Sequence, residues 1–340
     1  FATAISCLAA SPTIRHGRFG AGGTAIKLVR ESRALIEKNS FADNEVGVEI
    51  QMKSNPVVRG NIFTGHLNSA LAASNNSTGL IEGNTFRGNK QAIGIVRPYK
   101  DRIVGNRFIA NEVGVYCNQT QNTPEIAGNL FENNDVAMIN FAFSYPTVEN
   151  NRFLGNDQAV RNDQYGSPRV THNLFRDNGT ALYNYRKANP KVIKNVFRSN
   201  DLIMFCDYSS YPQVDDNNFL DNGRAVELGI YQSADWEKRS GSKKIILDKA
   251  RNLGSKNPLL PQAPTEFNDF VDVSGNWWGK KTERLEAAGA EANLDIFYDR
   301  RDKATVTYEG FGPDSYTLDW VKYAPWLDEP VADAGPKGGK

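Results

Sequence analysis

The sequence predicts an all-β chain folded as a right-handed parallel β-helix solenoid of about 11–13 coils, with an inserted loop region and an aromatic-rich C-terminal cap. Three observations support this prediction. An Asn-x-Phe motif recurs every 22 or 23 residues, a Val or Ile stands three residues before its Asn, and a second Asn usually follows five residues after it. The motif begins at Asn39, Asn61, Asn84, Asn106, Asn129, Asn151, Asn173, Asn195 and Asn217. Such a regular period indicates a repeat solenoid.

Each repeat contains short stretches of alternating apolar and polar residues, separated by Asn, Gly and Pro. This alternation is typical of β-strands, whereas a helical repeat needs apolar residues three and four positions apart. About 22 residues make one coil of three short strands, and coils stack at the inter-strand spacing of about 4.8 Å. Equivalent residues of successive coils therefore stack directly above one another. We expect the Phe column to fill the interior, and the Asn side chains to hydrogen-bond the buried backbone at the bends.

The chain is expected to divide into four parts. Coils should occupy residues 1–232, and an insertion between coils should occupy 233–270, because the final Asn match comes 59 residues after the one before it. Residues 271–330 should form the last coil and a cap over the open sheet edge, where an exposed edge would invite aggregation. Residues 331–340 are rich in Pro and Gly and are expected to be a flexible tail. The residues expected to cover the edge are Trp277, Trp278, Trp320, Tyr323 and Trp326.

The cysteines are predicted to be buried free thiols. Cys117 and Cys206 both lie eleven residues after a motif Asn, so they share one inward column. They are four coils apart, roughly 19 Å at the sheet spacing, whereas a disulfide needs Cα atoms within about 7 Å. Cys7 is similarly out of reach of Cys117.

Charge, apolar runs and histidine content argue against three classes of protein: nucleic-acid-binding, membrane-spanning and metal-binding. Lys and Arg total 40 and Asp and Glu total 39, so no basic surface for nucleic acid is indicated. No apolar run approaches the roughly 18 residues of a membrane-spanning helix. The three histidines, His16, His66 and His172, stand at or beside positions of the Asn columns and are expected to be structural. No metal site is therefore predicted.

The repeat resembles the right-handed parallel β-helix repeat proteins of the pectate-lyase-like superfamily, specifically their NosD-type branch, over about residues 2–230. The C-terminal part also resembles the closing signature of bacterial exported β-helix proteins. The residues that match are Asn276, Trp277, Trp278 and Gly279, then Ile296 to Asp299, then Val321, Tyr323 and Pro325. The resemblance implies a bacterial protein exported to the periplasm or cell surface. It implies no single activity, because this scaffold carries lyases, epimerases, hydrolases, copper-maturation factors and non-enzymatic surface proteins.

Outward-facing aromatic residues identify a candidate binding face. Counting ten residues from each motif Asn gives an outward column that includes Glu49, Leu71, Gly94 and Tyr116, and a second column lies two residues further on. Aromatic residues gather in these columns and in the loops that follow, and an exposed aromatic patch usually marks a binding surface. The alternative is that loops or the insertion cover it. The candidate residues are Tyr116, Phe141, Phe143, Tyr145, Arg161, Asp163, Tyr165, Tyr183, Tyr185, Phe205, Asp207, Tyr208 and Tyr211.

The function predicted from these features is a non-catalytic exported β-helix that binds or scaffolds. A protein partner in a cell-envelope complex is the first expectation and a polysaccharide the second. The alternatives are a polysaccharide lyase or epimerase and, more weakly, a NosD-like periplasmic metal-maturation factor. Asp163 and Asp207 are about 10 Å apart at the sheet spacing, too far to share one Ca²⁺. No catalytic residue or cofactor is predicted, and Ca²⁺ is expected only if the lyase or epimerase alternative holds.

Overall fold

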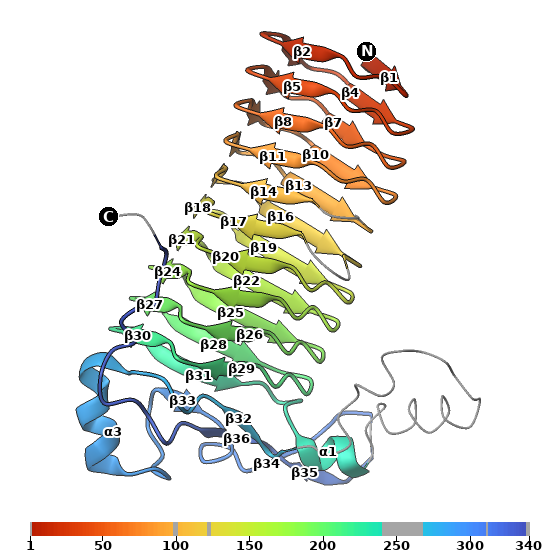
Figure 1. Cartoon of the computed structure of the whole chain (residues 1–340). Coiled ribbons are helices and arrows are strands. Elements are labelled where there is room, and N and C mark those ends of the chain that lie inside the picture. The colour runs from red at the N-terminus through yellow and green to blue at the C-terminus, as the bar shows by residue number, and fades with distance from the viewer. Residues whose placement is uncertain (1, 98–100, 121–123, 240–267, 311, 338–340) are drawn as a thin grey trace.

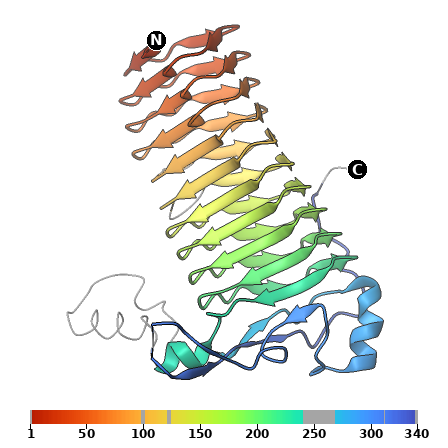
Figure 2. The same ribbon diagram turned by 180° about the vertical axis from the view of Figure 1, so that it is seen from behind.

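The computed structural model describes residues 2–97, 101–120, 124–239, 268–310 and 312–337. These residues form a right-handed parallel β-helix, and Figures 1 and 2 show its coils as one continuous stack from the N-terminus to the C-terminal cap. Within the described residues, the stack has ten coils that each give one strand to three parallel sheets, followed by a partial eleventh coil. The predicted fold class is thus confirmed, with the number of coils at the lower limit of the expected range.

The three sheets are named A, B and C in the order in which each coil visits them. Sheet A contains β1 (Thr3–Leu8), β4 (Thr24–Val29), β7 (Val46–Ile50), β10 (Ser69–Ser74), β13 (Gln91–Val96), β16 (Val113–Asn118), β19 (Val136–Phe141), β22 (Gln158–Asp163), β25 (Thr180–Tyr185), β28 (Leu202–Cys206), β31 (Arg224–Leu228) and β33 (Phe297–Tyr298). Sheet B contains β2 (Thr13–Arg15), β5 (Leu35–Glu37), β8 (Val57–Arg59), β11 (Leu80–Glu82), β14 (Arg102–Val104), β17 (Glu125–Ala127), β20 (Thr147–Glu149), β23 (Arg169–Thr171), β26 (Lys191–Ile193) and β29 (Gln213–Asp215). Sheet C contains β3 (Arg18–Gly20), β6 (Ser40–Ala42), β9 (Ile62–Thr64), β12 (Thr85–Arg87), β15 (Arg107–Ile109), β18 (Leu130–Glu132), β21 (Arg152–Leu154), β24 (Leu174–Arg176), β27 (Val196–Arg198) and β30 (Asn218–Leu220).

Phenylalanines from sheet C fill the interior, as predicted. From Phe19 to Phe197, each ring stacks on the next with centroids 4.6–5.1 Å apart and planes within 12° of parallel. The rings from Phe41 to Phe197 are fully buried. The stack arises because the strand register pairs each Phe with the Phe of the next coil. Burying one such side chain is worth roughly 1.5–3 kcal/mol, so this column is a main source of stability.

Asparagines form continuous ladders at two bends of the coil. In the ladder from Asn39 to Asn276, each Nδ2 donates to the Oδ1 of the next Asn over 2.9–3.1 Å, and the same Oδ1 accepts from the preceding Asn backbone N–H. Each Nδ2 also donates to a sheet B carbonyl, for example that of Ile103 for Asn129. The second ladder runs from Asn44 to Asn222. Both ladders satisfy backbone groups that the bends would leave unpaired in a dry interior.

Cysteine and histidine positions agree with the sequence analysis. All three cysteines are free and buried, and strand register places Cys117 and Cys206 in one inward column of sheet A. His66 replaces an Asn in the second ladder, where its Nδ1 lies 2.9 Å from Asn89 Oδ1. His66 therefore has a structural role.

The C-terminal cap covers the last coil with aromatic side chains. It contains α1 (Ala234–Arg239), β32 (Phe270–Asp272), the 3₁₀ helix η1 (Gly279–Lys281), α3 (Thr282–Ala288), β34 (Thr305–Thr307), β35 (Ser315–Thr317) and β36 (Trp320–Lys322). The Trp278 ring is 4.7 Å from Phe219 at the end of the Phe stack, and Phe297 stacks on Tyr323 at 4.8 Å. The predicted aromatic cap is thus present. No helix in the described ranges is long and apolar enough to cross a membrane.

Residues after the cap return along the outside of the coils, and Figure 1 shows this segment beside β30, β27 and β24. Val331 exchanges two hydrogen bonds with the Asn218 side chain, Asp333 forms an ion pair with Lys194 at 2.8 Å, and Lys337 N–H donates to Asn150 Oδ1. These contacts hold 331–337 against the surface, where the sequence suggested a flexible tail. Most of the predicted insertion, residues 240–267, lies outside the described residues.

Candidate functional site on sheet A

The predicted aromatic residues lie on the outer side of sheet A from β16 to β28 and in the bends that follow these strands. We call this surface the aromatic face. Its first row is Tyr116, Ile139, Arg161, Tyr183 and Phe205, and its second row is Asn118, Phe141, Asp163, Tyr185 and Asp207. Phe143, Tyr165 and Tyr208 stand in the bends, and Tyr145 and Tyr211 follow them. The strand register thus brings the predicted site residues together on one side of the solenoid.

Side chains of the first row stack along the solenoid axis. The Tyr183 and Phe205 rings are 4.8 Å apart and 20° from parallel, and the Arg161 guanidinium lies over the other side of Tyr183, 5.2 Å from the ring centroid. In the bends, Phe143 and Tyr165 stack at 4.8 Å and 6°. This stacking follows from the coil spacing of about 4.8 Å. In these pairs, neighbouring rings along the axis therefore cover one another's faces.

The tyrosine hydroxyls of this face are hydrogen-bonding groups rather than acids. Partial burial raises the pKa of Tyr116, Tyr165 and Tyr183 above the usual value of a phenol. Each hydroxyl stays protonated at neutral pH and can both donate and accept a hydrogen bond. Tyr116 Oη already accepts a hydrogen bond from Asn118 Nδ2 at 3.1 Å.

The cap covers the C-terminal end of the aromatic face. Ring contacts run from Tyr208 to Tyr231 at 4.3 Å and from Tyr231 to Tyr308 of the cap at 4.8 Å. The Tyr211 hydroxyl donates to Asp319 Oδ2 of the cap at 2.8 Å. Tyr208 and Tyr211 thus pack at the cap, while the first row from Tyr116 to Phe205 is partly exposed among the described residues. We call this row and the second-row rings beside it the open part of the aromatic face.

Asp163 is a buried carboxylate that forms an ion pair with the partly exposed side chain of Arg186. Its carboxylate is 3% exposed and accepts two hydrogen bonds from Arg186, Nε to Oδ1 at 2.7 Å and Nη2 to Oδ2 at 2.6 Å. This bidentate geometry is the strongest form of an arginine–carboxylate contact. Arg186 also lies over the Tyr185 ring, 5.2 Å from its centroid. The pair therefore fixes Tyr185 and leaves Asp163 poorly placed to act as a base.

Asp207, two coils further on, is buried without a cationic partner among the described residues. Its Oδ1 accepts hydrogen bonds from the backbone N–H groups of Tyr208 and Tyr231 at 2.9 and 2.8 Å. Burial raises the pKa of Asp207 to about 6. The carboxylate lies over Gly229, where a Cβ would come within 2.3 Å of it. Gly229 is therefore needed for this packing.

Three charged residues near the face were missed by the sequence analysis. Lys187 in the bend after β25 pairs with Glu237 of α1 at 3.1 Å, and Ser209 Oγ donates to the same Glu237 oxygen at 2.7 Å. Glu237 lies within the predicted insertion, so nothing in the repeat pattern could place it. Arg186 was likewise missed. It follows Asp163 by one coil plus one residue, and this spacing could have indicated that the two residues lie side by side on adjacent coils.

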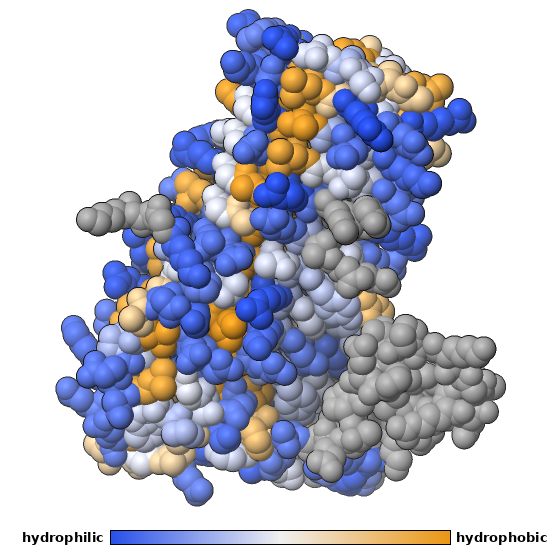
Figure 3. Space-filling view, viewed as in Figure 1, coloured by the Kyte–Doolittle hydropathy of each residue, from blue (hydrophilic) through white to orange (hydrophobic). Residues whose placement is uncertain are grey.

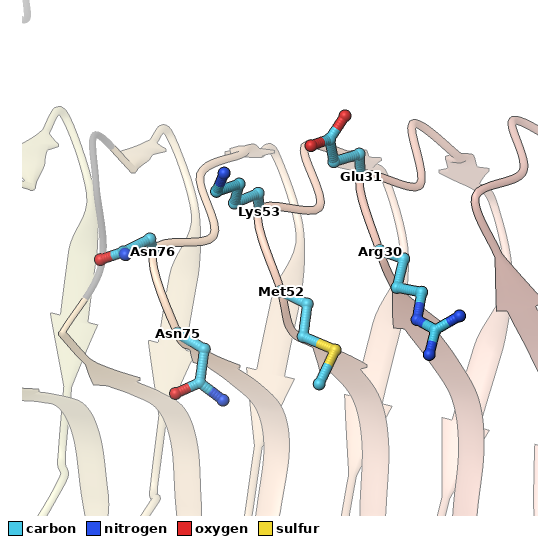
Figure 4. A pocket seen from close by; sticks show the side chains of 6 residues that line it. All are labelled: Arg30, Glu31, Met52, Lys53, Asn75 and Asn76. Atoms are coloured by element: carbon cyan, nitrogen blue, oxygen red, sulfur yellow. The ribbon is translucent and has the colours of Figure 1, made fainter.

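A shallow depression on the N-terminal coils lies away from the aromatic face. It is lined by residues of the bends after sheet A, namely Arg30, Glu31, Met52, Lys53, Asn75 and Asn76. Figure 4 shows these side chains projecting outward from successive bends. Figure 3 shows that hydrophobic side chains on one side of the molecule form a narrow stripe, interrupted by hydrophilic ones.

Two protein-family models match the chain. The model described as a right handed beta helix region matches residues 3–153, and the model described as periplasmic copper-binding protein (NosD) matches residues 125–254. Comparisons with curated proteins and with solved structures gave no match. The description of the second family as periplasmic agrees with the expectation of an exported protein.

The buried thiols and thioethers do not fit a copper site. Copper prefers Cys, Met and His ligands, and the chain contains three of each. Burial raises the pKa of the Cys117 thiol well above its usual value and that of Cys206 to about 12, so neither is a ready thiolate ligand. Met138 and Met204 lie in the same hydrophobic core.

The remaining soft ligands are dispersed. His66 is bonded within an Asn ladder, and Met52 lies among the charged and amide side chains of the depression in Figure 4. Across the described ranges, no group of three His, Cys, Asp or Glu side chains is arranged to hold a metal ion. The residues that the structure describes therefore do not supply a ligand cluster for the metal binding that the family description names.

The family matches overlap and together span residues 3–254, which includes the ten stacked coils. The repeat period, the Asn ladders and the internal Phe stack agree with both matches. This chain is a right-handed parallel β-helix repeat protein, and its later coils are similar to the NosD family over residues 125–254.

Proposed function

We propose that this chain is an exported, non-catalytic binding or scaffolding subunit that binds a protein partner of a cell-envelope complex through the open part of the aromatic face. The observation that supports this proposal is the gathering of partly buried rings on sheet A, with Arg161 stacked on one of them. Tyrosine, phenylalanine and arginine are enriched in protein interfaces, and tyrosine and arginine often dominate their binding energy. The family description supports a periplasmic location rather than the cell surface.

A polysaccharide is the second candidate ligand, and the ring geometry favours it less. Sugar rings bind aromatic side chains by lying on an uncovered ring face. Both faces of Tyr183 are covered, one by Arg161 and the other by Phe205. A protein partner can instead use the ring edges and the hydroxyl groups, which accept apolar contacts and hydrogen bonds.

The lyase or epimerase alternative needs a carboxylate that can reach substrate or Ca²⁺. Both oxygens of Asp163 are taken by Arg186, and Oδ1 of Asp207 is taken by two backbone amides. The metal-maturation alternative lacks a ligand cluster among the described residues. These observations favour a binding role over either alternative.

Affinity capture with face variants tests the proposal. The wild-type chain and the Tyr183→Ser/Phe205→Ser double variant are immobilised and exposed to a periplasmic and envelope extract of the source organism, and captured proteins are identified by mass spectrometry. The identified partner is then purified and its dissociation constant is measured with both chains. We expect at least tenfold weaker binding to the double variant. Thr85→Ser/Arg107→Gln, on the outer side of sheet C, is the matched control and should bind as the wild type does.

Unchanged partner affinity for the double variant would contradict the proposal. Binding of polygalacturonate to the wild type, with loss of that binding in the double variant, would favour the polysaccharide instead. Both residues are only partly buried, so the variants should fold, which circular dichroism and thermal unfolding check.

A further inference from the structure

Arg161 occupies the centre of the aromatic face. In its row it stands between Ile139 and Tyr183, and Phe141 stands in the second row one coil away. Its side chain is 37% exposed. The guanidinium lies over the Tyr183 ring, and stacking on an aromatic ring fixes its orientation while its edge remains open to solvent. Arg161 is therefore stacked on a ring and remains partly exposed.

The charge of Arg161 is not matched by a hydrogen-bonded partner. Arg161 forms a long ion pair with Asp163, from Nη2 to Oδ2 at 3.8 Å, which is beyond hydrogen-bond distance. That carboxylate is already paired through both oxygens with Arg186. The other nearby ion pair, Lys187 with Glu237, is also complete in itself. Among the residues that the structure describes, Arg161 thus donates no hydrogen bond, although a guanidinium carries five N–H donors.

We infer that Arg161 is the docking point for a carboxylate group of the partner, the side chain of an Asp or Glu in an acidic contact segment. This inference rests on the proposed function, because it assigns the chemistry of the partner at the same face. An arginine that is stacked on an aromatic ring and has unused donors fits a carboxylate through two parallel hydrogen bonds. Arginine at the centre of an aromatic interface is also a common centre of binding energy.

The source of the carboxylate is a protein rather than an acidic polysaccharide. A uronate residue would bring a carboxylate to Arg161, but its sugar ring would need an open aromatic face beside it. Tyr183 has none, because Arg161 and Phe205 cover its two faces. A side-chain carboxylate on a polypeptide needs only the edge of the guanidinium and the apolar surface formed by Ile139 and Phe141.

A spectroscopic titration with small molecules tests the inference before the partner is identified. The chain is labelled with ¹⁵N-arginine, and the Arg161 Nε–Hε signal is assigned by its loss in Arg161→Lys. The probes are N-acetylglutamate, N-acetylglutamine and galacturonate. We expect N-acetylglutamate to shift the Arg161 signal with a dissociation constant in the millimolar range, and N-acetylglutamine to leave it in place. No shift with N-acetylglutamate would overturn the inference. A shift at lower concentration with galacturonate would overturn the assignment to a protein.

The captured partner provides the second test. Arg161→Gln and Arg161→Lys should both weaken its binding at least tenfold, because Gln lacks the charge and Lys lacks the planar pair of donors. Arg107→Gln, an exposed arginine on sheet C, should leave the affinity unchanged. If the Tyr183→Ser/Phe205→Ser variant loses the partner while both Arg161 variants keep it, the proposed function stands and this inference fails. If all of these variants keep the partner, the proposed function itself fails.

Discussion

Replacing Asp207 by Asn should stabilise the protein at high pH and not at low pH. The carboxylate is 6% exposed, has no cationic partner among the described residues and has a pKa raised to about 6 by burial. An unfolded Asp has a pKa of about 3.9. The folded state therefore holds the proton more tightly than the unfolded state, so ionisation of Asp207 costs stability as the pH rises through about 4 to 6.

The size of this cost follows from the difference in pKa. A difference of about 2 units corresponds to about 3 kcal/mol at pH 8, and the cost vanishes below about pH 4. The amide of the Asp207→Asn variant cannot ionise, and its oxygen can still accept the hydrogen bonds from Tyr208 and Tyr231. For 340 residues, the entropy of unfolding near Tm is about 0.7 kcal/mol per kelvin. The variant should therefore raise Tm by about 4 °C at pH 8 if the solenoid unfolds as one unit.

Thermal unfolding of Asp207→Asn and the wild type, followed by circular dichroism from pH 4 to pH 8, measures this effect. Asp163→Asn is the matched control in the same row. It removes a carboxylate that Arg186 already neutralises, so it should lower Tm at pH 8 rather than raise it. A Tm difference for Asp207→Asn that is independent of pH, or a lower Tm at pH 8, would show that burial does not dominate at this carboxylate.

Three further predictions concern the core and the metal. Phe131→Ala should cost about 3–5 kcal/mol, because it leaves a cavity in a fully buried stack, whereas outward-facing Leu130→Ala should cost much less; chemical denaturation compares the two. The three buried cysteines should not react with a thiol reagent in the native protein and should all react in denaturant; rapid labelling of the native chain would contradict the core assignment. Copper added to the purified protein and removed by desalting should leave no stoichiometric metal by elemental analysis, since the described ligands are dispersed.

The repeat made the interior of this fold predictable from the sequence. Each coil places its Phe and Asn residues in the same environment, so one position in the period fixes all of its equivalents. Variation in coil length limits how accurately a count of residues from each motif Asn predicts which side chains face outward. Ten residues after Asn61 is Leu71, which was expected to face outward, but the structure buries Leu71 and places Ala72 in the outward row. The coil has one extra residue in the bend before β10, so a count from Asn61 places each side chain of β10 on the wrong side of the sheet.

The candidate face was predictable only in its outward-facing rows. Periodicity places Tyr183 and Phe205 in one row, because each is one coil from the next. It cannot show that Arg186 reaches back to Asp163, since that contact depends on side-chain conformation. Nor can it show that Tyr308 of the cap packs on Tyr231, because the cap does not follow the repeat. Contacts between repeating and non-repeating parts therefore had to come from the structure.

The solenoid itself does not require aromatic side chains at this face. The first row continues toward the N-terminus through Gly94 and Ala72 to Glu49 and Lys27, where the last two form an ion pair at 2.9 Å. The same strand geometry thus accepts a glycine, an alanine or charged residues, and inward-facing columns provide the packing in every coil. Stability of the coil cannot explain why rings gather between β16 and β28. This gathering supports the proposed binding role, and so does its position next to the cap, where Tyr208 stacks on Tyr231.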